Sequence, residues 1–236
     1  MEESDDGQYD YLFDDDDNDA SSDTGVQQSA GQLLAQLTDL LASTPLPPTP
    51  FPPASPTHIP GFHLYRAYLP SALLPAYHAW LTAQYFHAPD ANQAMHFGAL
   101  LDHTTPLGYL AHVCRPLRQN PHAFDQAIMN MYGAGEGIGD HVDLRRFMDG
   151  ICGVSFGAPA VMRLARVTDG ARQERYAEEA EGEDALYVEV RPGDVYVLEG
   201  EARWRWTHGF PRQIDGRDNV MDRRISITLR TLEPDE

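Results

Sequence analysis

Apolar residues recur at helical spacing in three segments of the first half of the chain. Between Ser29 and Ser43 they form one stripe, and a similar spacing returns in residues 70–84 and, less regularly, in residues 106–117. The stripes consist of Leu33, Leu34, Leu37, Leu40 and Leu41 in the first segment and of Leu73, Leu74, Tyr77, Trp80 and Leu81 in the second. A stripe of this kind most often packs on its own domain, so we expect packed helices.

Beyond Phe124 the pattern changes to short apolar or alternating runs that are separated by Gly, Pro and Asp. Several short strands at such spacing are typical of a β-sandwich or barrel, and a sheet region behind helices indicates an α+β fold. The polar, acid-rich residues 168–184 are interpreted as an exposed loop insertion. Strands are expected at residues 127–132, 151–156, 161–167, 185–190, 194–198 and 224–231.

Composition divides the chain into four parts. Residues 1–28 form an acidic tail that repels itself and has little apolar surface to bury, so we expect it to be disordered. An amphipathic helix follows at residues 29–44, and then a linker at residues 45–60 whose eight prolines favour an extended, semi-rigid chain. Residues 61–236 form the folded domain. Two uses of the tail stay open, a solvated segment and an interaction arm for a protein partner.

The net charge of −19 is unevenly distributed. Residues 1–65 contain 12 acidic residues and no basic residue, and the rest of the chain is still acidic. A protein that grips a nucleic-acid backbone normally has a basic stripe, so the charge does not indicate tight duplex binding, although nucleic acid stays open as a substrate. All 17 basic residues are arginines, and the lack of lysine excludes Schiff-base chemistry.

The N-terminus and the cysteines bear on the cellular location. No apolar run approaches the roughly 20 residues of a membrane span. The acidic N-terminus also lacks the basic start and apolar stretch of a secretory signal. We therefore expect an intracellular protein of the nucleus or cytoplasm, with no membrane partner. Cys114 and Cys152 are too few for a disulfide framework and are expected to be reduced, buried thiols.

The segment 127–143 contains the first candidate site. Its apolar run ends with Asn130 and Tyr132, four glycines follow within seven residues, and His141 and Asp143 come next. Residues two apart on a strand point the same way, so His141 and Asp143 would present an imidazole and a carboxylate together. Two histidines and one carboxylate on one face of the metal are the ligands of non-heme Fe(II) oxygenases. A bare His-x-Asp match is weak, so the remaining residues must supply the context.

His208 is the candidate for a third metal ligand. It lies in the sequence Trp-Thr-His-Gly at residues 206–209, at the end of the run that follows the turn at residues 192–194. The third ligand has to come from another strand of the same barrel, which this position allows. A lone histidine is more often a surface or core residue, so the assignment depends on its companions.

Residues 224–230 alternate polar and apolar side chains. Arg224, Ser226, Thr228 and Arg230 would share one face of a strand, opposite three apolar residues. Two guanidiniums that face inward require an anionic partner, because a buried charge without one is costly. A small dicarboxylate held by a bidentate arginine fits this face. The alternative is a polar strand that faces solvent.

The order of these motifs resembles the AlkB-like family of 2-oxoglutarate and Fe(II)-dependent dioxygenases, over about residues 94–232. The motifs are Asn-x-Tyr, His-x-Asp, a distant histidine in Trp-Thr-His-Gly, and Arg-x5-Arg. The resemblance implies a double-stranded β-helix, or jelly-roll, with an N-terminal helical extension. It also implies Fe(II) as the metal, with 2-oxoglutarate and O2 as co-substrates.

Site residues carry over from the family by motif. The implied iron ligands are His141, Asp143 and His208. The implied 2-oxoglutarate pocket consists of Asn130, Tyr132, Arg224 and Arg230, with Arg224 on the distal carboxylate. Residues 93–98 are similar to the substrate lid of the family, and the implied substrate contacts are His96, Phe97 and Arg145.

The implied reaction is the hydroxylation or oxidative demethylation of a nucleic-acid substrate, either RNA, including tRNA, or DNA. One departure from the family pattern bears on the substrate. Members that repair DNA often place an acid two residues beyond the ligand aspartate, whereas this chain has Arg145 followed by Arg146. A cationic alkylated base is disfavoured beside an arginine. This leaves tRNA modification, another nucleic acid or a protein side chain as targets.

Two hypotheses from other classes of protein stay open. The first is a catalytically silent jelly-roll module that uses the acidic tail and the leucine helix to hold a basic partner. The second is a zinc hydrolase, because zinc accepts the same histidine and carboxylate ligands. The hypothesis of a zinc hydrolase does not explain the presence of Arg224.

Overall fold

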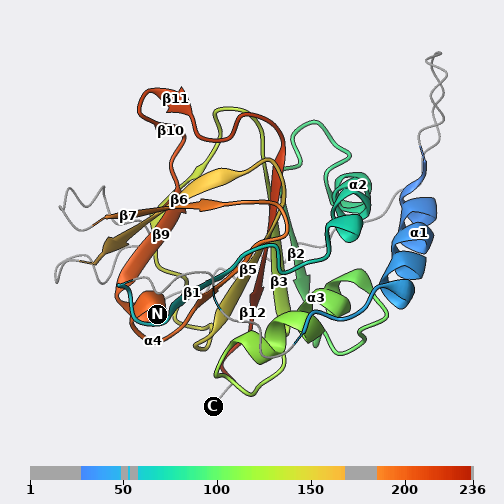
Figure 1. Cartoon of the computed structure of the whole chain (residues 1–236), viewed down its shortest axis with the longest axis horizontal. Helices are drawn as coiled ribbons and strands as arrows, with labels where there is room; N and C mark the ends of the chain where they lie inside the picture. Colours follow the sequence, from blue (N-terminus) through green and yellow to red (C-terminus); the bar gives the residue numbers. More distant parts are fainter. Residues whose placement is uncertain (1–27, 49–52, 54–57, 168–184, 235–236) are drawn as a thin grey trace, which may run out of the picture.

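Two antiparallel sheets form the body of the protein (Figure 1). The computed structural model describes residues 28–48, 53, 58–167 and 185–234, so the predictions for the acidic tail, for much of the proline-rich linker and for the loop 168–184 lie outside the described residues. One sheet has the strand order β1-β8-β5-β12-β3-β2, the other has the order β4-β9-β6-β7, and β10 and β11 form a separate hairpin. The predicted α+β jelly-roll is confirmed.

The strands have the following bounds. In the six-stranded sheet they are β1 (Phe62–Tyr65), β2 (Gln93–Phe97), β3 (Gln126–Tyr132), β5 (Ile151–Gly157), β8 (Val195–Leu198) and β12 (Arg224–Arg230). In the four-stranded sheet they are β4 (Ile138–His141), β6 (Ala160–Arg166), β7 (Leu186–Val190) and β9 (Trp206–Phe210). The hairpin consists of β10 (Gln213–Ile214) and β11 (Arg217–Asp218).

The helices are few and lie mainly on one side of the six-stranded sheet (Figure 1). They are α1 (Ala30–Ser43), α2 (Leu74–Tyr85), α3 (Pro106–Cys114) and α4 (Gly200–Trp204), with 3-10 turns at Ser71–Leu73 and Arg115–Leu117. None of the helices in the described part of the chain has the length and apolar character needed to cross a membrane.

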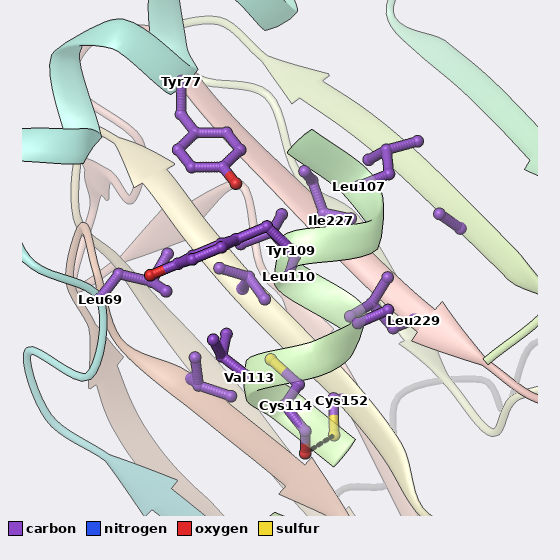
Figure 2. Close-up of a cluster of buried hydrophobic side chains, with 14 of the residues drawn as sticks. Leu69, Tyr77, Leu107, Tyr109, Leu110, Val113, Cys114, Cys152, Ile227 and Leu229 are labelled. Atoms are coloured by element: carbon purple, nitrogen blue, oxygen red, sulfur yellow. Dashed lines mark hydrogen bonds between the residues drawn. The ribbon is translucent and has the colours of Figure 1, made fainter. Parts of the chain in front are cut away.

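The six-stranded sheet separates two apolar layers because its side chains alternate between the faces. Ile225, Ile227 and Leu229 of β12 are fully buried in the apolar cluster that includes residues of α2 and α3. Figure 2 shows Ile227 and Leu229 beside α3. The opposite face packs on the four-stranded sheet, where a second cluster includes Met162 and Leu164 of β6. Side chains of β12 thus lie on both sides of the sheet, alternately facing the helices and the four-stranded sheet.

The helix α1 covers the segment in which the leucine stripe predicts a helix. Its start is fixed by a capping box between Ser29 and Gln32. Leu37 and Leu41 are buried in the cluster that also contains α2 and α3. The stripe therefore packs on the chain's own domain, as is usual for such a pattern.

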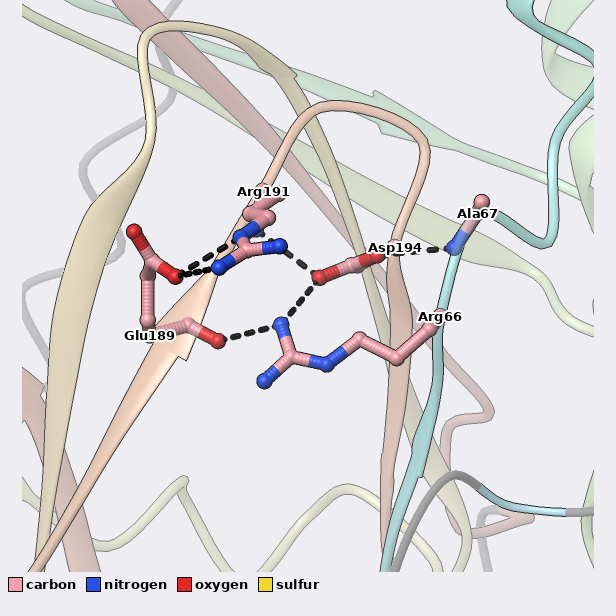
Figure 3. Close-up of polar contacts among 5 residues, drawn as sticks. All are labelled: Arg66, Ala67, Glu189, Arg191 and Asp194. Carbon is pink, nitrogen blue, oxygen red and sulfur yellow. Dashed lines mark hydrogen bonds and ion pairs between the residues drawn. The ribbon is translucent and has the colours of Figure 1, made fainter.

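Asp194 ties the turn between β7 and β8 to the segment after β1 (Figure 3). Its carboxylate accepts hydrogen bonds from Arg66 at 2.6 Å, from the Ala67 main chain at 2.8 Å and from the Arg191 main chain at 2.9 Å. Ala67 has a φ of 46°, a left-handed conformation that an alanine rarely adopts without such support. The turn preceding β8 is therefore rigidly held.

Two predictions of local structure are wrong in detail. β4 ends at His141, so Asp143 lies beyond the strand rather than two residues along it. His208 does not end the run 194–198, because α4 intervenes and His208 belongs to its own strand, β9. Both β4 and β9 are short strands that contain a glycine, which weakens the alternation that would have revealed them.

Candidate metal centre

His141 and His208 face each other across the strand pair β4 and β9. They are register partners, and their ring centroids are 4.5 Å apart. The close approach of the strands depends on Gly209, since a Cβ atom there would lie 2.6 Å from the Asp140 carboxylate. Arg163 of β6 forms an ion pair with Asp140 and so connects β6 to β4 next to His141. The strand ladder therefore sets the separation of the two imidazoles.

The tautomer of His141 follows from one contact. Its Nδ1 lies 2.9 Å from the carbonyl oxygen of Gly139. A carbonyl oxygen can only accept, so we assign the proton to Nδ1, which leaves the lone pair of Nε2 free. Histidines that bind metals commonly donate their other ring N–H in this way.

Asp143 completes a group of three side chains whose ligating atoms all lie within 4.8 Å of one another. Its Oδ1 forms an ion pair with Arg230, and its Oδ2 lies 3.4 Å from Nε2 of His208. Among the described residues, no donor forms a hydrogen bond to this buried Oδ2, although buried polar atoms are normally paired. An unpartnered carboxylate oxygen beside two imidazole nitrogens fits a divalent cation such as Fe(II).

The electrostatics favour the metal-binding forms of these side chains. Burial disfavours the imidazolium of His208 and lowers its pKa from 6.5 to about 3, so the ring is neutral at pH 7. Burial alone would raise the pKa of Asp143, but Arg230, followed by the two histidines and Arg203, lowers this pKa below its ordinary value. A neutral imidazole and an ionised carboxylate are the forms that coordinate a metal.

A cavity of about 240 Å³ borders the three side chains. Its wall comes mainly from β2, β3 and β12, together with the loop after β4. Asp143 is the single carboxylate among the described residues of this wall, whereas Arg146 and Arg230 contribute guanidiniums. The charge of the wall favours an anionic or neutral occupant.

Arg224 lies fully buried behind two aromatic residues of the cavity wall. Its guanidinium carbon is 3.9 Å from the ring centroid of Phe210 and 5.5 Å from that of Tyr132, and both rings line the cavity. Arg224 itself does not line it. None of its three side-chain nitrogens has a hydrogen-bond partner in the described part of the chain. A buried guanidinium without an anion is costly, so this residue calls for an anionic ligand.

The structure brings most of the predicted site residues together. His141, Asp143, His208, Asn130, Tyr132 and Arg230 all line the cavity. Arg230 differs from the expectation in one respect, because its guanidinium is engaged by the carboxylate of Asp143. It therefore orients the Asp143 carboxylate as well as bordering the expected 2-oxoglutarate pocket. Asn130 accepts a hydrogen bond from the Gln93 side chain at 2.7 Å.

The three predicted substrate contacts do not line the cavity. On β2 the residues Gln93 and Met95 line it, and strand alternation places His96 on the opposite face of the sheet. Phe97 shares the face of Met95 but lies farther along, with 55% of its surface exposed. Arg145 is exposed, and its neighbour Arg146 lines the cavity instead. The predicted lid stretch therefore borders the cavity through Gln93 and Met95, and the role of His96, Phe97 and Arg145 in substrate binding stays a prediction.

Sequence reasoning missed two groups that shape the site. Tyr196 of β8 lines the cavity, and it reaches across β5 because residue 153 is glycine, where a Cβ atom would lie 2.0 Å from the tyrosine ring. Arg203 of α4 contacts the main chain of the Asp143 loop. The continuous apolar run of residues 195–198 was a usable signal for a buried strand, whereas Arg203 lies in a segment without clear periodicity.

Comparisons with known proteins agree with this geometry. Residues 74–230 match the family model of the 2OG-Fe(II) oxygenase superfamily. The chain is 30% identical over 116 residues to the "Alkylated DNA repair protein ALKBH8 homolog" of Arabidopsis thaliana, which covers 45% of this chain and 34% of that protein. It is 31% identical over 96 residues to the "tRNA (carboxymethyluridine(34)-5-O)-methyltransferase alkbh8" of Xenopus tropicalis, which covers 40% of this chain and 13% of that protein.

A solved structure described as "The structure of OsALKBH1" is similar in fold, with a TM-score of 0.52 and 16% identity, and the match covers 75% of this chain and 100% of that chain. The chain spans about a third of the length of its Arabidopsis relative and about an eighth of its Xenopus relative. The resemblance to AlkB-like dioxygenases is confirmed, and Fe(II), 2-oxoglutarate and O2 are the metal and co-substrates of the family. The chain belongs to the 2OG-Fe(II) oxygenase superfamily.

Proposed function

We propose that the protein uses Fe(II), O2 and 2-oxoglutarate to hydroxylate or oxidatively demethylate a nucleic-acid substrate, with RNA or tRNA favoured over alkylated DNA. One observation carries the chemistry. Oδ2 of Asp143 is buried without a donor, beside the imidazoles of His141 and His208. A carboxylate kept in this state is explained by a metal that it binds.

His141, Asp143 and His208 would hold Fe(II), which on binding supplies the activation of O2 that protein side chains cannot provide. The protein prepares the ligands for this metal. Arg230 engages Oδ1 of Asp143 and so leaves Oδ2 to face the histidines. Burial keeps His208 neutral, with its lone pair available.

2-Oxoglutarate would enter the cavity beside the three ligands. Its distal carboxylate fits Arg224, whose guanidinium has three nitrogens without hydrogen-bond partners among the described residues. Tyr132 and Phe210 border this guanidinium and exclude water from it. A charge-assisted pair in such a setting is strong, because no solvent competes for the carboxylate.

The proposed substrate class is supported by two kinds of observation. The relatives from Arabidopsis and Xenopus carry names that refer to alkylated DNA and to tRNA. Within the cavity, Arg146 adds a positive charge near the expected substrate position, and it has no ion pair among the described residues. This charge disfavours the cationic alkylated bases of damaged DNA and favours a neutral or anionic base.

The test is the production of succinate from 2-oxoglutarate by the iron-loaded protein. Substrate arms are methylated DNA and RNA oligonucleotides, unfractionated tRNA and a set of methylated peptides. We expect turnover that depends on Fe(II) and is stimulated by RNA or tRNA. His141→Ala should abolish it, whereas His122→Ala, at an exposed position that does not line the cavity, should not.

Stimulation by peptides alone would move the proposal to protein side chains. A protein that neither turns over 2-oxoglutarate nor binds it would contradict the oxygenase proposal altogether.

A further inference from the structure

The loop that follows Asp143 is held by a buried arginine of α4. Arg203 is 2% exposed, and its guanidinium donates to the main-chain carbonyl of Asp143 at 3.2 Å. The same guanidinium donates to the carbonyls of Leu144 at 2.9 Å and Phe147 at 3.1 Å. One side chain therefore satisfies three carbonyl oxygens in five consecutive residues.

This loop needs support that the sheet does not provide. The ladder between β4 and β9 fixes His141 against His208, but β4 ends at His141. Asp143 is thus two residues past the last position that strand pairing controls. Arg230 engages its carboxylate from β12, and Arg203 engages its backbone from α4. Arg230 thus contacts the side chain of Asp143, and Arg203 contacts its main chain.

The helix α4 is itself anchored through its first three residues. The amide of Gly200 donates to both oxygens of the Asp149 carboxylate at 3.0 and 3.1 Å, and the amide of Ala202 donates to the Pro60 carbonyl at 3.0 Å. The guanidinium of Arg203 also lies 4.0 Å from the ring centroid of Trp204. α4 leads directly into β9, which carries His208. The segment 200–208 therefore supplies one metal ligand and holds the loop of another.

We infer that Arg203 is a positioning residue of the metal centre: it fixes the Asp143 loop to the segment that carries His208, so that Oδ2 of Asp143 faces the two imidazoles. The inference rests on the proposed metal site but not on any substrate. Arg203 touches no reacting atom, because its contacts are with main-chain carbonyls and with Trp204.

The geometry of a guanidinium explains why arginine occupies this position. Its planar fork can donate in several fixed directions at once, whereas a lysine ammonium is a compact charge on a flexible stem. Arg203→Lys keeps the charge beside Asp143 but cannot reach all three carbonyls with the same geometry. The substitution thus separates the positioning of the loop from the electrostatic effect on the carboxylate.

The first measurement is the affinity of the folded protein for Co(II), followed by the absorption bands of the bound ion. We expect Arg203→Lys to weaken Co(II) binding by about 10- to 100-fold, the range seen when outer-shell partners of metal ligands are changed. Arg205→Lys is the matched control, since Arg205 lies two residues away on the same segment and is exposed. Its affinity should equal that of the wild type.

The second measurement is amide hydrogen exchange in the metal-free protein. The amide of Phe147 donates to Leu144, and that of Met148 donates to Thr231, so both are protected while the loop is in place. We expect Arg203→Lys to accelerate exchange at these two amides by about 10-fold or more and to leave the amides of β12 unchanged. This measurement needs no metal, so it tests the positioning role of Arg203 independently of metal binding. If the wild-type protein bound no metal, that result would contradict the proposed function instead.

Asp149→Ala serves as a second variant in case Arg203→Lys does not fold. It removes the acceptor of the Gly200 amide while Arg203 stays in place. We expect a weakening of Co(II) binding by about 3- to 10-fold, as for the loss of one hydrogen bond. Wild-type affinity and wild-type exchange in the folded variants would overturn the inference. A lower melting temperature with unchanged metal affinity would likewise show a merely structural role.

Discussion

The two faces of strand β12 differ in what they bury. On the side of the helices, Ile225, Ile227 and Leu229 belong to the apolar cluster that includes residues of α2 and α3. On the side of the cavity, the same strand buries Arg224, whose nitrogens lack partners among the described residues. Removing apolar surface from water stabilises the fold by about 25 cal/mol per Å², whereas a buried group without a partner costs free energy.

The apolar face of β12 therefore stabilises the fold. The cavity face lowers the stability of the ligand-free protein, and its buried charge is explained by the binding of a ligand. On the cavity side, Asp143 and Arg224 have charged side-chain atoms without hydrogen-bond partners among the described residues, whereas Trp80 and Tyr109 on the helix side leave only neutral groups unpartnered. Such atoms are explained if a metal and a dicarboxylate satisfy the two charged groups. Substitutions on the two faces should therefore have opposite consequences, for stability on one face and for ligand binding on the other.

The largest effect is expected from Arg224→Met on the cavity face. Methionine fills much of the same space but cannot pair with a carboxylate, and a bidentate charge-assisted pair is worth several kcal/mol. We expect the affinity of the metal-loaded protein for 2-oxoglutarate to fall by at least about 100-fold, measured by calorimetry. The free energy of unfolding without ligand should stay the same or rise, because a costly buried charge has been removed. A variant with a lower free energy of unfolding and an unchanged affinity for 2-oxoglutarate would contradict this assignment of the two faces.

Ile227→Ala on the helix face should have the opposite profile. The change leaves a cavity in a fully buried apolar layer, and such substitutions typically cost about 2–5 kcal/mol of unfolding free energy. Urea denaturation measures this loss. Turnover of 2-oxoglutarate per folded molecule should equal that of the wild type below the unfolding transition. A loss of activity without a loss of stability would show that this face also takes part in the chemistry.

A smaller effect is expected from pH, and it should arise on the cavity side. Burial lowers the pKa of His208 from 6.5 to about 3. Below pH 6.5 the unfolded chain therefore binds a proton that the folded chain takes up only near pH 3, so stability falls as the pH falls through this window. At pH 5 the loss should be about 1–2 kcal/mol relative to pH 7.5 in the presence of a chelator.

His208→Leu is the test of that assignment, because it removes the titrating group. The variant should show a flatter dependence of unfolding free energy on pH between 7.5 and 5. An unchanged slope would assign the dependence to other groups.

The smallest effect is expected for the thiols of the helix side. Cys114 and Cys152 are free and buried, as predicted, and burial raises the pKa of Cys152 to about 12 (Figure 2). Since the thiolate is the reactive form, neither thiol should react with a disulfide reagent at pH 8 while the protein is folded. Both should react in denaturant. Rapid labelling of the native protein would mean that this layer opens readily.

Much of the fold could be predicted from local patterns. The strict alternation of residues 224–230 indicated both faces of β12, and the leucine stripe indicated α1, because each element is long enough for its period to be visible. His141 and His208 were expected on strands, but the bounds of β4 and β9 were not predicted, since both strands are short and contain glycine. The hairpin of β10 and β11 has only two residues in each strand.

The candidate site was predicted unevenly. The two histidines, Asp143 and the two arginines followed from the order of motifs, and the structure places them around one cavity or against its wall. The pairing of Arg230 with Asp143 could not be predicted, because the spacing of two arginines does not say which anion each one meets. His96 does not line the cavity because a shift of one residue on β2 exchanges the faces of the sheet, which a sequence pattern alone does not fix.

The central claim is that His141, Asp143 and His208 together hold one Fe(II) beside a 2-oxoglutarate site that contains Arg224. The most direct measurement is an anaerobic titration of the protein with Fe(II) and then with 2-oxoglutarate, followed by optical absorption. We expect one iron per chain and a visible band that appears when the 2-oxoacid chelates the iron, absent in Asp143→Ala. A protein that binds no iron, or that gives the same spectrum after Asp143→Ala, would contradict the claim.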